Sequence, residues 1–316
     1  HYPYFHPFFL TLPFNKLAKK VVVTIHDLIP LIYPKHYPPG LKGSIRFLIQ
    51  KFLLRNVDAI ITISETSKKD ICRFLGFRPD KVSVVYLAPR KIFRKLNLNT
   101  SLIRISEVKQ RYDLPDKFVF YVGDVNYNKN IPTLVEACDF AKIPLVICGK
   151  QALEIEEPGK GMQTLEGPQD WVRFIFNKPH PELSHHKKIL TEFKKSKNIL
   201  RLGFVPDEDL VAIYNLATVY CQPSFYEGFG LPILEAMACE CPVVASKTQT
   251  LVEIGEGAAL FADTKDPKDM AGKISTFLND SGTRDQLVET GKVLVENFSW
   301  EKTARETLDL YSSLMP

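Results

Sequence analysis

The chain has 316 residues, of which 45% are apolar, and its formal net charge is +5. This length suffices for two domains with their own cores, and the composition excludes a disordered or fibrous chain. Because Lys and Arg are spread along the sequence, the mild positive charge does not predict nucleic-acid binding, although it suits phosphate-bearing ligands.

The six cysteines lie mostly within apolar runs and lack the paired spacing of a zinc site or a disulfide framework. We expect free, buried thiols in a reducing compartment, and no bound metal or cofactor. No run approaches about 18 apolar residues, and no signal peptide is recognised. The sequence therefore predicts a cytoplasmic protein and leaves peripheral contact with the inner face of the plasma membrane open.

Residues 1–87 predict a partial Rossmann-like domain. Three β-rich runs are expected to be strands, at 21–25, 59–63 and 82–86, and a helix is expected from about 41 to 55. A complete partner for the second half would need two or three more βα units before His1. We therefore expect a chain that is truncated at its N-terminus or belongs to a reduced protein.

The helix at 41–55 carries Lys42, Arg46 and Arg55. A solvated face is the favoured interpretation of these charges, and contact with anionic lipid is the alternative. Residues 88–116 are polar, show no strong period and are expected to be the interdomain linker.

Residues 117–298 predict a complete doubly wound α/β domain, because short β-rich runs alternate with helical patterns. The expected strands are 118–122, 145–148, 199–204, 219–222, 243–246 and 259–262. Two of the expected helices are 130–141 and 207–216, with Asn130 and Asp207 as N-caps. Residues 150–198 separate two strands by far more than a usual connection and are predicted to be an insertion, with a basic, solvated helix at 185–197.

The segment PSFYEGFGLPILEAMACEC at 223–241 carries the chemistry. A strand is expected to end near its start, and Pro232 to lie in the first turn of a helix. Gly228 and Gly230 allow a close backbone approach and a positive φ. At the positive end of this helix, a diphosphate could bind three backbone amides that are expected to be free, those of Gly230, Leu231 and Ile233.

Two carboxylates flank this predicted anion site. Glu227 and Glu235 are expected to reach past the diphosphate to sugar and ribose hydroxyls, which carboxylates accept well. Taken singly, Glu227 could be a loop charge and Glu235 a complement to the helix N-terminus. Lys129, in the loop that follows a strand and Gly123, is placed to neutralise a phosphate at the same sheet edge.

In the front half, a predicted strand runs directly into His26 and Asp27. His26 would face the cleft between the domains, where it could hydrogen-bond a sugar hydroxyl or the reacting group; a purely structural histidine is the alternative. Asp27 could fix the tautomer of His26 or cap a turn.

EGFGLPILEAMA, which begins at Glu227, resembles the E-x7-E signature of retaining family-four glycosyltransferases with the GT-B fold. Further segments similar to that family follow its order: TIHDLIPLIYPKHYP, AIITISETSKKDI, FVFYVGDVNYNKN, LGFVPDEDLVAIY and FSWEKTARETLDLY. These motifs cover nearly the whole chain apart from 150–198. The similarity is greatest to bacterial mannosyltransferases that build lipopolysaccharide O-antigen and related glycans.

The resemblance implies a role for each matching residue. Glu227 would contact the hydroxyls of the transferred sugar and Glu235 those of the ribose. Lys129 would stabilise the leaving diphosphate, and Gly123 would let it approach. The sugar and phosphate would be held by a run of backbone amides, those of Gly228, Phe229, Gly230 and Leu231.

Two further positions come from the same resemblance. The backbone of Val205 would meet the nucleotide base, and His26 would lie over the sugar on the acceptor side, within the first domain. Such enzymes need no metal, because the Lys and the helix N-terminus stabilise the leaving group. Residues 299–316 match the C-terminal helix that crosses back to the first domain, with Ala304, Leu308 and Tyr311 on its docking face.

The resemblance therefore implies a metal-independent hexosyltransferase. It would move a sugar, with mannose expected, from a nucleotide-diphosphate sugar to a glycan or lipid-linked acceptor; GDP-mannose is the expected donor and a UDP-sugar the alternative. The loop DVNYN lacks the Arg usual in the family. A non-catalytic nucleotide-sugar binder is therefore the second hypothesis, and a phosphorylase-like enzyme a weaker third.

Overall fold

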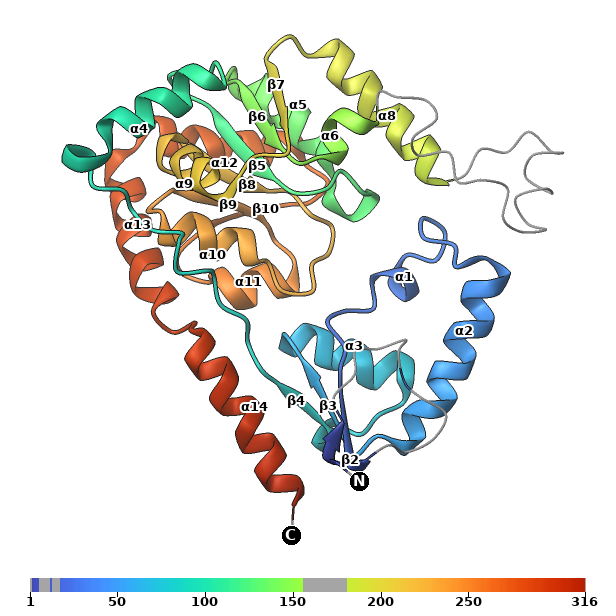
Figure 1. Cartoon of the computed structure of the whole chain (residues 1–316). Coiled ribbons are helices and arrows are strands. Elements are labelled where there is room, and N and C mark those ends of the chain that lie inside the picture. Colours follow the sequence, from blue (N-terminus) through green and yellow to red (C-terminus); the bar gives the residue numbers. More distant parts are fainter. Residues whose placement is uncertain (1, 6–11, 13–17, 156–180, 316) are drawn as a thin grey trace, which may run out of the picture.

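A computed structural model describes residues 2–5, 12, 18–155 and 181–315 of the chain. These residues form two α/β lobes, each built on a parallel sheet, and α14 (Trp300–Leu314) runs from the rear lobe back along the front lobe (Figure 1). The predicted fold class, two Rossmann-like halves in one chain, is confirmed.

The front lobe holds a sheet of order β1-β2-β3-β4. Its elements are β1 (Tyr2–Phe5), β2 (Ala18–Thr24), α1 (Ile29–Ile32), α2 (Gly40–Leu53), η1 (Leu54–Asn56), β3 (Ala59–Thr62), α3 (Glu65–Leu75), η2 (Pro79–Lys81) and β4 (Val82–Val84). The three predicted strands are present, and β1 adds a fourth by pairing in parallel with β2.

Alternation along β2 explains how this sheet is covered. Val21 and Val23 pack with residues of α2 and α3 on one face, whereas Val22 lies on the face covered by α14. The start and end of α3 follow from its flanking residues. The Ser64 hydroxyl accepts a hydrogen bond from a first-turn amide, and Gly76 ends the helix at φ +79°.

The rear lobe holds a six-stranded sheet of order β10-β9-β8-β5-β6-β7. Its strands are β5 (Val119–Val122), β6 (Leu145–Cys148), β7 (Ile199–Gly203), β8 (Val219–Gln222), β9 (Val243–Ser246) and β10 (Leu260–Ala262). Its helices are η3 (Tyr127–Lys129), α5 (Ile131–Ala141), α6 (Gln151–Glu154), α8 (Pro181–Lys195), α9 (Asp207–Leu216), α10 (Leu231–Ala238), α11 (Gln249–Gly255), α12 (Pro267–Asn279) and α13 (Ser281–Val295). All six predicted strands are confirmed.

Both faces of the rear sheet are buried. Phe118 and Phe120 pack on the face covered by α9 and α10, whereas Val119 and Tyr121 pack on the face covered by α5, α8 and α12. Such two-sided burial is why the strands read as continuous apolar runs. The predicted basic helix of the insertion is present in α8, which packs on α5; residues 156–180 lie outside the described residues.

Three local expectations need correction. The range predicted as linker contains a helix, α4 (Leu98–Arg111), which buries Val108 and packs on α9. Asn130 precedes α5 but does not cap it, because its backbone is left-handed (φ +53°) and its side-chain amide donates to the Pro223 carbonyl. Asp207 is the first residue of α9 rather than its cap, and its carboxylate pairs with Arg90.

The C-terminal helix also differs from its expected orientation. Leu310, Tyr311 and Leu314 pack on the front sheet, so only Tyr311 of the predicted docking face is correct. Ala304 is exposed, and Leu308 is 60% exposed. The face of α14 that packs on the sheet is therefore rotated by about one residue from the predicted face. The amphipathic pattern alone does not determine this rotation.

The cysteines are free, and five of the six are buried, as predicted. Among the described residues, no helix combines the length and apolar content needed to cross a membrane. In the same part of the chain, no group of three or more His, Cys, Asp or Glu side chains is placed to hold a metal ion.

Candidate active site

The candidate site lies at the carboxyl ends of β5 and β8. These two strands are neighbours, and the chain builds the sheet outward from them in opposite directions, through β6 and β7 on one side and β9 and β10 on the other. Open α/β sheets bind ligands at such a switch point. The loop after β5 contains Lys129, and the loop after β8 contains Glu227.

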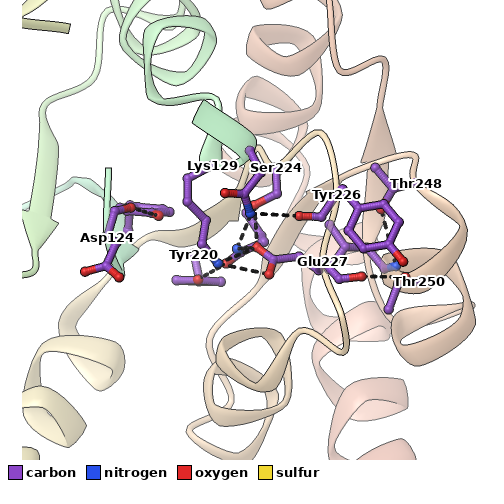
Figure 2. Close-up of polar contacts among 12 residues, drawn as sticks. Asp124, Lys129, Tyr220, Ser224, Tyr226, Glu227, Thr248 and Thr250 are labelled. Atoms are coloured by element: carbon purple, nitrogen blue, oxygen red, sulfur yellow. Dashed lines mark hydrogen bonds and ion pairs between the residues drawn. The ribbon is translucent and has the colours of Figure 1, made fainter. Parts of the chain in front are cut away.

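The structure brings these two side chains together. Lys129 Nζ donates to both carboxylate oxygens of Glu227, at 2.9 Å each (Figure 2). The Lys129 side chain is 22% exposed and that of Glu227 is 9% exposed. The pair is therefore largely shielded from water, and each charge stabilises the other.

Glu227 is further held from its own strand and loop. Its Oε1 accepts hydrogen bonds from Gln222 Nε2 at 2.6 Å and Ser224 Oγ at 2.5 Å, and the Tyr220 hydroxyl in turn donates to Gln222 (Figure 2). The Thr250 hydroxyl donates to the Glu227 carbonyl at 2.8 Å. The carboxylate is thus fixed by several donors, which preorganises it without a ligand.

The turn after Glu227 leads into α10 through Gly230, whose φ is +106°. This left-handed conformation is the one predicted for a glycine here. Within the described residues, the amides of Gly230 and Leu231 have no protein acceptor. The Ile233 amide donates to the Gly230 carbonyl at 3.0 Å, so the expectation that it is free is wrong. Two amides remain for an anion at the positive end of α10.

Glu235 lies in the second turn of α10, not in the first as its predicted role beside the N-terminus assumed. Its Oε2 accepts a hydrogen bond from the Tyr214 hydroxyl at 3.2 Å. Burial raises the pKa of Glu235 to about 7. Burial raises the pKa of Tyr220 well above its usual value, and the nearby charges of Glu227 and Glu235 raise it further.

The front lobe reaches the same turn. A Cβ at position 228 would lie 3.0 Å from the Cβ of Asp27 and 3.4 Å from the His26 carbonyl oxygen. Gly228 does not have a positive φ, so its glycine is explained by this close approach and not by backbone conformation. Asp27 Oδ1 accepts a hydrogen bond from the Ile29 amide at 3.0 Å. Asp27 therefore caps a turn, which was one of its two predicted roles. His26 is exposed beside it.

Two predicted positions lie around this edge of the sheet. Gly123 follows β5 with φ +143°, and a Cβ at its neighbour Gly149 would come within 2.1 Å of the Gly123 carbonyl oxygen. Only glycine fits this approach of two loops. Val205 follows β7 and packs into the core with residues of α9. Its backbone contact with the nucleotide base stays a prediction, as do the other ligand contacts.

Several contacts between the lobes were not foreseen, and two of them involve Tyr37 and Glu253. The Tyr37 hydroxyl donates to Asn128 Oδ1 at 2.6 Å and accepts from the Asn128 amide at 3.1 Å. The Glu253 carboxylate of α11 accepts from the Glu65 amide, at the start of α3, at 2.7 Å. Tyr37 lies within the segment TIHDLIPLIYPKHYP, but no pattern in the sequence indicates which partner it meets.

Family models agree with this geometry. The model described as "Glycosyl transferases group 1" matches residues 104–294, and that described as "Glycosyltransferase Family 4" matches residues 1–88. The boundary between them falls close to the passage from the front lobe to the rear one.

Curated relatives give the same result. "O-antigen chain mannosyltransferase B" of Escherichia coli is 30% identical over 308 residues, which cover 94% of this chain and 71% of the relative. "Serotype-specific mannosyltransferase WbdA" of the same species is 26% identical over 311 residues, which cover 97% of this chain. The matched part spans 35% of WbdA.

Solved structures agree with the fold. Sucrose-phosphate synthase from Thermosynechococcus elongatus superposes with a TM-score of 0.72 at 24% identity and covers 99% of this chain and 74% of its own. Anabaena Alr3699/HepE, solved with UDP-glucose, gives 0.68 at 18% identity, with 93% and 72% covered. Motif resemblance, family models and relatives agree: the chain belongs to the group 1 glycosyl transferases and has the GT-B fold.

Proposed function

We propose that this chain transfers a hexose, with mannose as the sugar and GDP-mannose as the donor, to a glycan or lipid-linked acceptor with retention of anomeric configuration. The observation that carries the proposal is the Lys129–Glu227 pair, whose Glu227 lies four residues before the start of α10. The pair brings a cation from the loop after β5 to a carboxylate in the loop after β8, and that second loop also carries the amides of Gly230 and Leu231, which have no protein acceptor among the described residues.

Each group has a step to perform. When the bond between the sugar and the diphosphate breaks, the departing oxygen gains negative charge. Lys129 and the amides of Gly230 and Leu231 would stabilise that charge, so that no divalent ion is needed. Glu227 would then orient the sugar through its hydroxyls, and Glu235 would accept from the ribose. His26 would face the sugar from the acceptor side.

The choice of mannose rests on the relatives, two of which are named as mannosyltransferases. The choice of base is less constrained, since the related Anabaena structure contains UDP-glucose. GDP-mannose is therefore proposed as the donor and a UDP-hexose as its competitor. The backbone of Val205, after β7, is the contact that we propose for the base.

The test is a donor comparison. The protein is incubated with GDP-mannose or UDP-glucose, with methyl α-mannoside as the acceptor, and the release of nucleoside diphosphate is followed. We expect release from GDP-mannose that depends on the acceptor, a product whose anomeric configuration by NMR matches that of the donor, and activity that persists in EDTA. Faster release from UDP-glucose would reject the donor, an inverted product would reject retention, and loss of activity in EDTA would reject metal independence.

A further inference from the structure

Helix α2 lies on the outer side of the front lobe (Figure 1). It exposes a row of large apolar side chains. Leu48 is 64% exposed and Phe52 is 61% exposed, which is unusual for residues of this kind on one helix. We call the row the apolar stripe; it consists of Leu41, Ile45, Leu48, Ile49 and Phe52.

The helical period explains why these residues form one face. Spacings of three and four residues place them along one side of the helix, and Gln50 and Leu53, which point elsewhere, are buried. The lobe therefore uses one face of α2 for its own core. The side chains of the apolar stripe stay between 38% and 64% exposed, and Arg55 lies over the Phe52 ring, 5.1 Å from its centroid.

The flanks of the apolar stripe are basic. Lys42, Arg46, Lys51 and Arg55 are all exposed, and the helix GLKGSIRFLIQKFL contains no Asp or Glu. The charged side chains of the helix are therefore all basic, whereas the chain as a whole carries 41 basic and 36 acidic residues.

The C-terminal end of the stripe borders a hollow of about 450 Å³. Leu48 and Phe52 line it from α2, and Leu75 and Phe77 line it from the end of α3. Lys51 and Arg55 stand at its rim. A hollow lined by both apolar and cationic side chains suits an acyl chain next to an anionic headgroup.

We propose that α2 docks the front lobe on an anionic membrane surface. The apolar stripe enters the boundary between headgroups and acyl chains, and the four basic side chains bind lipid phosphates. An amphipathic helix of this composition lies in the plane of the membrane and does not cross it. The sequence alone favoured a solvated face, because the burial of Gln50 and Leu53, which leaves the stripe outside, cannot be read from the charges.

The start of α2 lies close to the candidate active site, whereas the hollow at its other end lies about 20 Å farther along the helix. Tyr37 lies three residues before α2 begins, and its hydroxyl is bonded to Asn128, the neighbour of Lys129. A membrane beneath α2 would thus present a lipid-linked acceptor near the reacting groups. This placement rests on the proposed transferase activity, whereas membrane binding itself does not.

The test is vesicle flotation of the purified chain. We expect binding to phosphatidylcholine vesicles containing about 30% phosphatidylglycerol, and weak binding to phosphatidylcholine alone. Leu48→Ser with Phe52→Ser should reduce the partition coefficient by about tenfold or more, because two large side chains no longer leave water. Lys42→Glu with Arg46→Glu should abolish the preference for the anionic vesicles.

Matched controls use other parts of the surface. Ile103→Ser, at a side chain 77% exposed on α4, and Lys187→Glu with Lys194→Glu, on the basic helix α8, should leave binding unchanged. Thermal unfolding verifies that every variant is folded. Equal binding by wild type and the double serine variant, or a wild-type dimer that this variant dissociates, would overturn the proposal. Release of nucleoside diphosphate from GDP-mannose in vesicle-free solution tests the transferase activity separately.

Discussion

At the scale of single residues, Lys129 and Glu227 have unequal surroundings. Glu227 is 7% exposed and keeps donors from Gln222 and Ser224 when Lys129 is removed, whereas Lys129 is near enough to solvent to be hydrated when Glu227 is neutralised. Lys129→Met leaves a buried carboxylate without its cation and should cost about 3 kcal/mol of stability. Glu227→Gln should cost about 1 kcal/mol, measured by denaturant unfolding.

The three variants of this pair should rank differently in activity than in stability. Either single variant is expected to lower kcat by about a hundredfold or more if both groups act on the transition state as proposed. The double variant, Lys129→Met with Glu227→Gln, should regain stability relative to Lys129→Met but remain inactive. If activity returned together with stability, the pair would be structural only.

Glu235 provides a pH-dependent signal. Burial raises its pKa to about 7, against 4.5 for an unperturbed glutamate. Between these values the folded protein keeps a proton that the unfolded chain has released, so stability is lost as pH rises toward 7 and is constant above it. We expect Tm to fall by on the order of 5 °C between about pH 5 and pH 7.5 in the wild type, relative to Glu235→Gln.

Nucleotide binding should change in the opposite direction over the same interval. Ribose hydroxyls are accepted better by a charged carboxylate, so the affinity for GDP is expected to increase as Glu235 ionises, and Glu235→Gln should remove this dependence. Calorimetry at a series of pH values measures both variants. A pH dependence that persists in Glu235→Gln would assign the titration to another group.

At the scale of elements, the short turn η3 connects the two lobes with the reacting groups. Asn128 lies within it, bonded to Tyr37 of the front lobe, while its amide nitrogen Nδ2 donates to the Tyr226 carbonyl at 3.2 Å. Lys129 directly follows Asn128, and Glu227 directly follows Tyr226. Tyr37→Phe should therefore lower kcat by about tenfold through misplacement of the pair, with little change in the affinity for GDP.

Tyr33→Phe is the matched control for this prediction. Its hydroxyl lies 3.5 Å from the Phe225 carbonyl, a weak contact in the same region. Steady-state kinetics with GDP-mannose should therefore show kcat close to that of the wild type. An equal loss in the two variants would mean that the aromatic packing, and not the Tyr37–Asn128 bond, positions the turn.

The elements that the sequence predicted well are those buried on two faces. Strands such as β6, β8 and β9 are continuous apolar runs between polar loops, so their bounds follow from the residues alone. The turn from Glu227 into α10 was also predictable, because Gly230 and a proline at the helix start restrict the backbone locally. The residues of each segment alone therefore determine these strands and this turn.

The parts that could not be predicted depend on distant contacts. Asn130 resembles an N-cap, yet its amide binds a carbonyl 93 positions away. The residues of α14 that pack on the front sheet depend on the shape of that sheet. The apolar pattern of the helix alone did not distinguish this face from the neighbouring one that was predicted. The Tyr37–Asn128 bond joins segments 91 residues apart. No local pattern encodes such partners.

At the scale of the whole molecule, the lobes meet through groups that belong to the site. Gly228 contacts Asp27, and the Ser67 hydroxyl donates to the Gly228 carbonyl at 3.3 Å. Figure 1 shows that α14 also spans the two lobes on the opposite side of the molecule from α2. Movement of one lobe relative to the other would consequently change the geometry around Gly228, which couples the arrangement of the lobes to binding.

Glu253 is the contact by which this coupling can be tested. Its carboxylate accepts from the amides of Glu65 and Thr66, at 2.7 and 3.2 Å, and from the Tyr86 hydroxyl at 3.1 Å. A negative charge at the N-terminus of α3 is favoured by the helix dipole, so Glu253→Gln should weaken the association of the lobes. We expect faster hydrogen exchange at the first amides of α3 and a larger radius of gyration in X-ray scattering. Glu289→Gln, on the exposed surface of α13, should change neither, and unchanged exchange in Glu253→Gln would show that other contacts hold the lobes together.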